Sequence, residues 1–241
     1  MRDLTAIVLA AGAGKRLGRG LGDRPKALLE VGGESLIARL IRQLRAAEVE
    51  HIVVVIGYRG EDARRALAAQ GGIALLDNPD YRRGAILSLW AARDFLDRPV
   101  LVMDADVFAP DAMIARLVDS RQENCFLLDG RVAPGGEEQM LMIEGGRVLD
   151  IARRPRGRFE LLGESVGFLK LSAAAAETLC RLLAARLERG DLDIEHEEVY
   201  PELLAQVEVG FERVDDLDWT EIDFPADLER ARDLAGRGGG A

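Results

Sequence analysis

The sequence predicts an α/β fold built on one mixed, mainly parallel sheet. In the N-terminal half, apolar β-branched runs alternate with amphipathic segments, which is the pattern of right-handed βαβ units in a parallel sheet. Beyond residue 123, short apolar runs follow one another closely, and Gly145-Gly146 lies between two of them as in a tight hairpin. That half is expected to be antiparallel or mixed. Because no linker or repeat separates the halves, we expect them to share one sheet.

Strands are expected at short apolar runs, and helices where apolar residues recur every three or four positions. In the first half this predicts strands at residues 6–9, 51–56, 73–76 and 100–103, and helices at residues 34–47, 59–70 and 86–95. In the second half it predicts strands at residues 126–128, 140–143, 148–151, 207–214 and 219–222, and helices at residues 172–188, 195–205 and 225–234. The glycines in residues 163–169 are expected to leave backbone exposed for a ligand. The result is one domain, residues 1–235, made of halves 1–123 and 124–235, with a disordered tail at residues 236–241.

The composition is that of a soluble globular chain, with 48% of the 241 residues hydrophobic and 31% charged. A formal net charge of −10 argues against general nucleic-acid binding, which depends on clustered Lys and Arg. Cys125 and Cys180 lack metal-binding spacing, so we expect buried free thiols, as in a reducing cytoplasm. Asp3 interrupts any signal-peptide pattern, and no apolar run approaches the ~20 residues of a membrane span. We expect a cytoplasmic monomer or homodimer without a membrane partner.

The first strand ends in a loop of small and basic residues. Backbone N–H groups around Gly12 and Gly14 can point at one anion, because glycine allows positive φ and close approach to the backbone. Lys15, Arg16 and Lys26 supply positive charge nearby. The sequence thus predicts a phosphate-binding loop, and the alternative is a tight strand-to-helix turn with three solvated basic residues.

Two familiar phosphate loops do not fit this spacing. A Walker loop requires Ser or Thr after Gly-Lys, but Arg16 follows Lys15. The dinucleotide fingerprint G-x-G-x-x-G requires glycine at Leu17 and an acidic residue at the end of the second strand, which instead continues into Gly57-Tyr58. Neither motif explains the loop.

Carboxylates follow two later strands. Asp104 and Asp106 come directly after the strand at residues 100–103, and strand alternation places both on the same side, at the edge where parallel sheets bind ligands. A protein-bound triphosphate usually carries Mg²⁺, which takes one or two carboxylates. We expect Asp106 and Asp223 as the ligands. The alternatives are turn chemistry for the first pair and a helix N-cap before Pro225 for Asp223.

These motifs together resemble a known enzyme superfamily. L-A-A-G-x-G-x-R at residues 9–16, followed by P-K-A-L-L at residues 25–29, is similar to the signature loop of the sugar-nucleotide and alcohol-phosphate nucleotidyltransferases. Asp106-Val107 and E-I-D-F-P-x-D-L at residues 221–228 resemble its two magnesium aspartates. The resemblance implies a Rossmann-like three-layer α/β/α nucleotidyltransferase domain, with a nucleotide-binding first half and an acceptor-binding second half.

The resemblance also implies the roles of individual residues. Those expected to act in catalysis are Lys26, Arg16 and Asp106, and those expected to hold Mg²⁺ are Asp106 and Asp223. The residues expected to bind the nucleotide are Leu9, Ala10, Ala11, Gly12, Ala13, Gly14, Lys15, Arg16, Lys26, Asn78, Ser88 and Asp104.

The middle of the chain narrows the resemblance to one branch. Asn78-x-x-Tyr81 with I-L-S-L-W at residues 86–90, and G-E-S-V-G at residues 163–167, resemble the cytidylyltransferases for phosphocholine, 2-aminoethylphosphonate or inositol 1-phosphate. CTP is therefore the expected nucleotide. Ala85 stands where relatives often carry Asn, and Leu141 near where they carry Lys, which leaves the acceptor open. Acidic and aromatic groups expected to bind it are Asp129, Glu164, Glu198 and Trp219.

The expected reaction needs no general base, because a phosphomonoester with a second pKa near ~6 is already an anionic nucleophile at neutral pH. Three alternatives stay open: a sugar-1-phosphate nucleotidyltransferase using UTP, GTP or dTTP, a GT-A glycosyltransferase, and a non-catalytic nucleotide-binding regulator. His196 lies in H-E-E-V-Y, which lacks the second histidine of a zinc motif, so we interpret it as part of a helix start.

Overall fold

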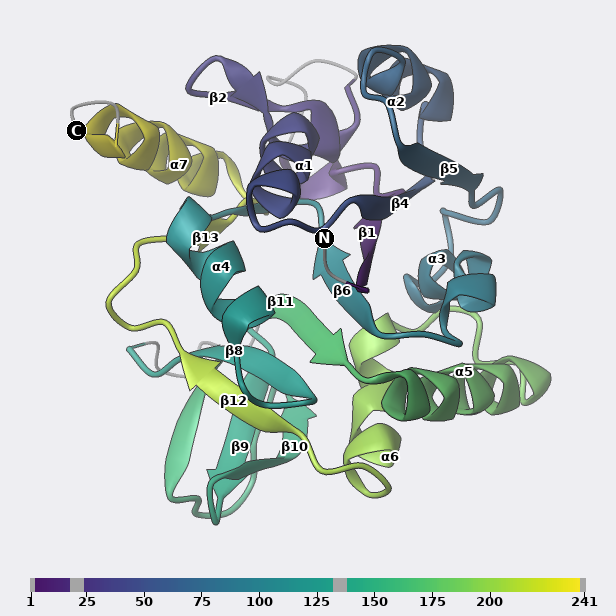
Figure 1. The fold of residues 1–241 in the computed structure, drawn as a ribbon, viewed down its shortest axis with the longest axis vertical. Coiled ribbons are helices and arrows are strands. Elements are labelled where there is room, and N and C mark those ends of the chain that lie inside the picture. The colour runs from purple at the N-terminus through teal and green to yellow at the C-terminus, as the bar shows by residue number, and fades with distance from the viewer. Residues whose placement is uncertain (1–2, 18–23, 132–137, 239–241) are drawn as a thin grey trace.

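The computed structural model describes residues 3–17, 24–131 and 138–238, without the side chain of Lys15. A nine-stranded sheet forms its middle layer (Figure 1). Along the main path of the sheet the strands are β10 (Arg147–Ala152), β9 (Met140–Glu144), β11 (Leu161–Leu171), β6 (Val100–Asp104), β1 (Thr5–Ala10), β4 (His51–Ile56) and β5 (Ile73–Asp77). Beside this path, β8 (Cys125–Asp129) pairs with β11 and with β12 (Gly210–Arg213). Both halves of the chain therefore share one sheet.

Strand direction divides the sheet in two. The strands β6, β1, β4 and β5 are mutually parallel, whereas β11 runs antiparallel to β6, β8 and β9. Strand β11 joins the two parts, because its end at Phe168–Leu171 pairs with β6 and its beginning at Leu161–Glu164 pairs with β9. The predicted mixed sheet is confirmed.

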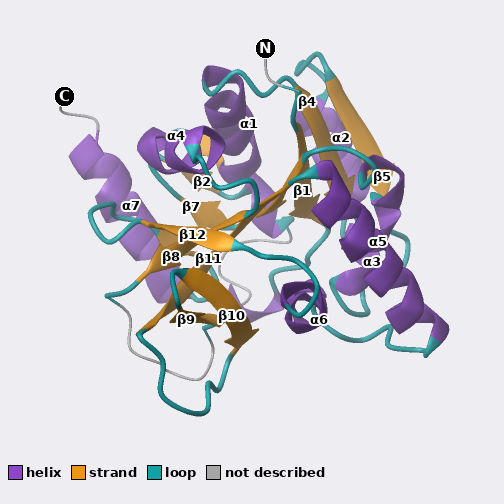
Figure 2. Cartoon of the chain, turned by 60° about the horizontal axis from the view of Figure 1, so that its bottom comes forward, coloured by secondary structure: helices purple, strands orange, loops and turns teal. Residues whose placement is uncertain are grey.

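Helices cover both faces of the sheet (Figures 1 and 2). One face packs against α1 (Leu36–Ala46), α2 (Gly60–Leu67) and α4 (Asp111–Asp119), and the other packs against α3 (Ile86–Ala91), α5 (Ala173–Glu188) and α6 (Tyr200–Leu204). Alternation in β1 separates the cores, since Ala6 and Val8 face the first layer and Ile7 faces the second. Helix α7 (Pro225–Gly238) joins a third, smaller cluster. The three-layer prediction is confirmed.

Several elements differ from the prediction. Helix α4 was not predicted, although Met113, Ile114 and Leu117 have helical spacing and are buried. The strands β2 (Glu30–Val31), β3 (Glu34–Ser35) and β7 (Val107–Phe108) were also missed, because two-residue strands carry almost no periodic signal. Strand β7 pairs with β13 (Thr220–Glu221), which lies within the strand predicted at residues 219–222.

Boundaries shift at other elements. The helix predicted at residues 86–95 is α3 followed by a 3₁₀ turn at Arg93–Phe95, and the one predicted at residues 195–205 is a 3₁₀ turn at His196–Val199 followed by α6. No strand was predicted where β11 lies, and β12 is shorter than predicted. Helix α7 continues to Gly238, so residues 236–238 of the predicted disordered tail are helical, and residues 239–241 lie outside the described part.

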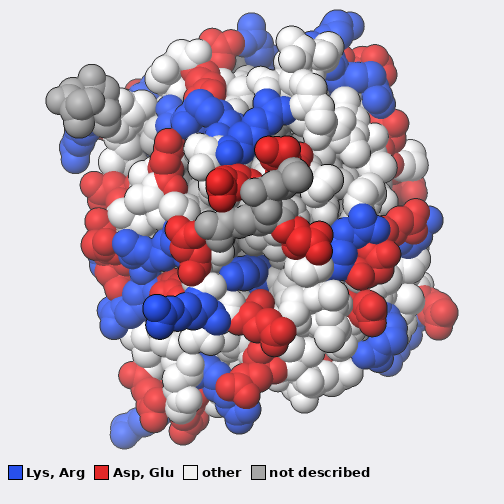
Figure 3. Space-filling model, in the orientation of Figure 1, with Lys and Arg blue, Asp and Glu red and all other residues white. Residues whose placement is uncertain are grey.

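Two surface features agree with the composition. Acidic and basic side chains are interspersed over the face in Figure 3, which offers no continuous basic surface. Within the described ranges, none of the helices is both long and apolar enough to cross a bilayer. Cys125 and Cys180 are free thiols, and Cys180 is half-buried rather than buried as predicted.

Candidate active site

A cavity of about 380 Å³ opens at the carboxyl ends of β1 and β6. The predicted site residues that line it are Leu9, Ala11, Gly12, Ala13, Gly14, Arg16, Lys26, Ser88, Asp104, Asp106 and Asp223. The other lining residues are Tyr81, Arg82, Arg83, Ala85, Arg153, Glu195, His196, Glu197 and Glu221. The structure therefore brings the glycine loop and both predicted metal ligands to one place.

Lys26 connects the two distant aspartates. Its Nζ donates hydrogen bonds to Asp106 Oδ2 at 2.7 Å and to Asp223 Oδ1 at 2.5 Å. Arg16 Nη1 donates to the other oxygen of Asp223 at 3.0 Å. The Lys26 side chain is only 10% exposed, and it enters the cavity from a 3₁₀ turn that follows Pro25. Residues 197 positions apart in the sequence thus form one polar network.

The polar network stabilises the charged forms of Lys26 and Asp223. Burial opposes the charge of Lys26, but attraction by Asp106 and Asp223 outweighs burial and raises the Lys26 pKa above its ordinary value. Burial likewise works against the Asp223 carboxylate, yet its hydrogen bonds from Lys26 and Arg16 lower its pKa. Lys26 therefore stays positively charged at neutral pH.

The same place fits a magnesium ion. Asp106, Glu221 and Asp223 each direct a carboxylate oxygen to a space in which these oxygens lie within 4.8 Å of one another. Asp106 Oδ1 is buried and has no hydrogen-bond partner among the described residues, so this oxygen is available to a ligand. Oxygen ligands of this kind are those that Mg²⁺ takes. The residues present fit the ion.

Glu221 was missed at the sequence level. It lies two residues before Asp223 at the end of β13, so the alternation of E-I-D already placed both carboxylates on one side. Although Glu221 is exposed to the cavity, reduced hydration there and the charges of Asp106 and Asp223 raise its pKa. Three carboxylates therefore face two cations, Lys26 and Arg16.

The glycine loop is held against the end of β4. Tyr58 N donates to Ala11 O at 3.0 Å, and a Cβ on Gly57 would lie 2.5 Å from Tyr81 Cβ, so only glycine fits there. Gly14 has φ +59°, and a Cβ on it would lie 3.2 Å from Lys26 Cβ. Close packing thus sets the loop beside Lys26.

The opposite wall of the cavity comes from the second half of the chain. Gly84 N donates to Leu192 O at 3.0 Å, and Ile86 N donates to Ile194 O at 3.2 Å. A Cβ on Gly84 would lie 2.1 Å from Ile194 O, so the two segments meet only because residue 84 is glycine. This docking brings the turn at His196–Val199 to the cavity.

A second cavity of about 250 Å³ adjoins the first and shares Glu221 and Asp223 with it. Asp129, Glu164 and Trp219, three of the predicted acceptor-binding residues, line it. Burial, reinforced by nearby carboxylates, raises the pKa of Glu164 to about 7. Its remaining lining residues are Glu138, Thr220, Phe224, Asp227 and Arg230.

Asp129 is already fully engaged in this second cavity. It accepts hydrogen bonds from Arg131 and, at 2.9 Å, from the indole Nε1 of Trp219. The two predicted acceptor residues thus orient each other.

Three predicted residues line neither cavity. Ala10 is buried in the core. Asn78 donates to Ser88 Oγ at 3.0 Å and accepts from Asp80 N, so it ties the turn after β5 to Ser88 in α3. Glu198 accepts from Glu195 N at 3.0 Å in the capping box of the turn at His196–Val199. The side chain of Lys15 lies outside the described part.

Fold and site together define a class of protein. A three-layer α/β/α domain that joins a glycine loop, a buried lysine and a triad of carboxylates is a nucleotidyltransferase. The model of the MobA-like NTP transferase domain matches residues 6–165, and the chain belongs to this family.

Two curated relatives are similar to the chain along most of its length. A bifunctional IPC transferase and DIPP synthase of Rubrobacter xylanophilus is 34% identical over 95% of this chain. The chain spans about half the length of that relative, 51%. A 2-aminoethylphosphonate cytidylyltransferase of Lancefieldella rimae is 28% identical, over 92% of this chain and 89% of the relative. The predicted membership of this enzyme class is confirmed.

Solved structures share the fold. The CTP:phosphocholine cytidylyltransferase LicC of Streptococcus pneumoniae superposes with a TM-score of 0.81 and 23% identity, over 97% of this chain and 99% of LicC. The inositol-1-phosphate CTP transferase of T. maritima gives a TM-score of 0.75 and 22% identity, over 97% and 95%. At sequence identities this low, the two similarities establish a shared fold and nothing more.

Proposed function

We propose that this protein is a Mg²⁺-dependent cytidylyltransferase that transfers CMP from CTP to a small phospho-alcohol or phosphonate and releases pyrophosphate. The observation that carries the proposal is the bridge from Lys26 to Asp106 and Asp223 beside the glycine loop. The named activities of the relatives support the choice of CTP and of this acceptor class. The free thiols support a cytoplasmic location.

Different residues are proposed to bind the triphosphate and the metal ion. The backbone around Gly12 and Gly14 faces the cavity and suits the triphosphate, while Arg16 and Lys26 supply positive charge on the same side. Asp106, Asp223 and Glu221 would hold Mg²⁺, which when bound neutralises phosphate charge. Lys26 then stands where negative charge accumulates as pyrophosphate departs.

The transfer step needs positioning and charge neutralisation rather than proton transfer. An oxygen of the acceptor phosphate or phosphonate forms the new bond to the α-phosphorus, and the bond from that phosphorus to the bridging oxygen breaks, so that pyrophosphate leaves with its electron pair. The acceptor oxygen is already anionic at neutral pH, so no proton moves. Arg82, Arg83 and Arg153 line the cavity and suit the acceptor phosphate.

The second cavity is the proposed place for the rest of the acceptor. Its acidic lining, together with the aromatic residue Trp219 in its wall, favours a small cationic group such as choline or aminoethyl. Because it meets the first cavity at Asp223, one small molecule can reach from it to the nucleotide.

A pyrophosphate-release assay tests the proposal. CTP, UTP, GTP and dTTP would each be paired with phosphocholine, 2-aminoethylphosphonate, inositol 1-phosphate and glucose 1-phosphate in the presence of Mg²⁺. We expect CTP to be preferred with one of the first three acceptors. Preference for another nucleotide with glucose 1-phosphate would identify a sugar-1-phosphate nucleotidyltransferase, and CTP binding without release for any acceptor would identify a regulator.

A further inference from the structure

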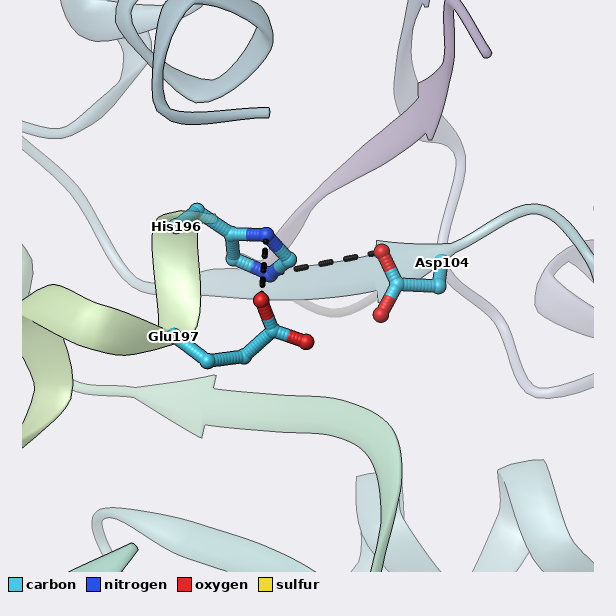
Figure 4. Close-up of side chains that lie close together, drawn as sticks. All are labelled: Asp104, His196 and Glu197. Carbon is cyan, nitrogen blue, oxygen red and sulfur yellow. Dashed lines mark ion pairs between the residues drawn. The ribbon is translucent and has the colours of Figure 1, made fainter. Parts of the chain in front are cut away.

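A second cluster of metal-ligating side chains lies on the far wall of the nucleotide cavity. Asp104 ends β6, and His196 and Glu197 begin the turn at His196–Val199, so the cluster joins the two halves of the chain (Figure 4). One ligand atom from each of the three residues lies within 4.8 Å of the others. The cluster is separate from Asp106, Glu221 and Asp223, which form the group already described.

The imidazole of His196 is buried but not satisfied. The residue is 4% exposed, and its Nδ1 has no hydrogen-bond partner among the described residues. Nδ1 lies 3.1 Å from Glu197 Oε2 without hydrogen-bond geometry, and Nε2 lies 4.0 Å from Asp104 Oδ1. Figure 4 shows the ring facing both carboxylates. A buried polar atom left without a partner is costly, so this nitrogen is available to a ligand.

We propose that Asp104, His196 and Glu197 bind a divalent transition-metal ion, of the Mn²⁺ or Zn²⁺ class, at a site distinct from the magnesium site. The inference goes beyond the proposed function, because the site requires neither CTP nor turnover.

The donor set favours such an ion over Mg²⁺. Imidazole nitrogen suits Zn²⁺ and related transition ions, whereas Mg²⁺ takes oxygen ligands. Two carboxylates and one imidazole also leave positions open toward the cavity, where water or phosphate oxygens can complete the coordination. The cluster therefore differs in chemistry from its all-carboxylate neighbour.

The charges around the cluster favour binding of a cation. Among the described residues, His196 is the only ion-pair contact of Asp104 and also of Glu197. Both carboxylates face a cavity that is proposed to hold an anionic nucleotide. An ion between them would remove the repulsion between the two acids and the phosphates.

The protein holds the three side chains in place. The capping box between Glu195 and Glu198 fixes the turn that presents His196 and Glu197. Gly167 in β11 has φ +81°, and a Cβ on it would lie 2.7 Å from Asp104 Oδ2, so the absence of a side chain there makes room for the Asp104 carboxylate. Side chains held in this way are typical of a preorganised binding site and not of acidic residues scattered over a surface.

Mn²⁺ binding followed by electron–nuclear double resonance tests the proposal without any assay of activity. The chain has two histidines, and His51 is exposed at the start of β4. We expect a directly coordinated ¹⁴N in the native protein and in His51→Gln, and its loss in His196→Gln. Asp223→Asn should disturb the magnesium site and keep the nitrogen signal.

A second variant covers the case in which His196→Gln does not fold. Glu197→Gln keeps the imidazole and should weaken Mn²⁺ binding at this site at least about tenfold. A native protein whose bound Mn²⁺ shows only oxygen ligands would overturn the proposal, and so would a nitrogen signal that survives in His196→Gln. The first of these results would instead favour a substrate group as the partner of His196.

Discussion

The two sides of the candidate site are built in different ways. The glycine-loop side, where the nucleotide is proposed to bind, comes from residues 9–16 together with Lys26, and close backbone packing shapes it. The acceptor side is assembled from β8, β11, β13 and α7, and its key groups are single side chains on separate elements. The comparison teaches that the first side is a local motif, whereas the second exists only in the folded chain. Lys26 with Asp223 is where the two sides meet.

The largest expected effect comes from Lys26. Lys26→Met keeps much of the stem and removes the charge between Asp106 and Asp223, so turnover should fall on the order of 10²-fold or more. Steady-state kinetics with saturating CTP and acceptor would measure this loss, and thermal unfolding would check the fold. Wild-type-like turnover would remove Lys26 from the reaction.

Asp223→Asn tests the connection between the two sides. The change removes a proposed Mg²⁺ ligand and an ion-pair partner of both Lys26 and Arg16. We expect turnover to fall on the order of 10²-fold and the Mg²⁺ concentration for half-maximal rate to rise. As a control, Asp216→Asn alters an exposed ion pair with Arg116 outside both cavities and should leave the rate unchanged. Equal Mg²⁺ requirements in Asp223→Asn and the native enzyme would separate Asp223 from the metal.

Gly167→Ala should disturb Asp104 in the wall of the first cavity. The new Cβ would meet Asp104 at 2.7 Å in a backbone with φ +81°. Gly190 is a matched control, because its φ is +87° and a Cβ there would meet nothing within 4 Å. In both variants, the left-handed backbone should lower the free energy of unfolding by about 1 kcal/mol.

Only Gly167→Ala should add a steric cost, about 1–3 kcal/mol in unfolding free energy, and lower activity. Denaturant unfolding of the two variants would measure the difference. Equal destabilisation and equal activity would show that the space beside Asp104 is unimportant.

Glu164 should give the smallest effect and one that depends on pH. Its pKa rises from 4.5 to about 7 on folding, so its unfavourable contribution to stability is absent below pH 4.5 and complete above pH 7. At pH 8, Glu164→Gln should therefore be more stable than the native protein by about 1 kcal/mol, after allowance for partial exposure. Chemical denaturation at pH 4 and pH 8 would measure this, and an equal difference at both values would refute the assignment.

The same carboxyl should affect acceptor binding. If the acceptor contains a cationic group, the KM for the acceptor should fall as pH rises through 7 and Glu164 becomes charged. Glu164→Gln should lose that part of the pH dependence while keeping the part due to the acceptor phosphate. Identical profiles would place the cation elsewhere.

Sequence reasoning succeeded where chemistry is local. Strand periodicity located β1, β4 and β6, and the glycine loop followed from adjacent residues. For Asp223, the resemblance was needed to favour a metal ligand over a helix N-cap, because nothing in its own neighbourhood distinguishes the two.

Sequence reasoning failed where the partner is distant. The role of His196 in the cavity depends on Asp104, which lies 92 positions earlier, and on the docking of residues 84–86 against residues 192–194. No periodicity or spacing encodes such a contact. Asn78 and Glu198 show the converse, since each accepts a hydrogen bond from a backbone N–H instead of lining a cavity.

Calorimetric titration of CTP with and without Mg²⁺ tests the central claim most directly, because the account requires one metal ion to be shared by the nucleotide and two distant aspartates. We predict that Mg²⁺ strengthens CTP binding at least about tenfold in the native protein and has no such effect in Asp106→Asn. CTP affinity that is independent of Mg²⁺, or equal enhancement in the native protein and in Asp106→Asn, would contradict it.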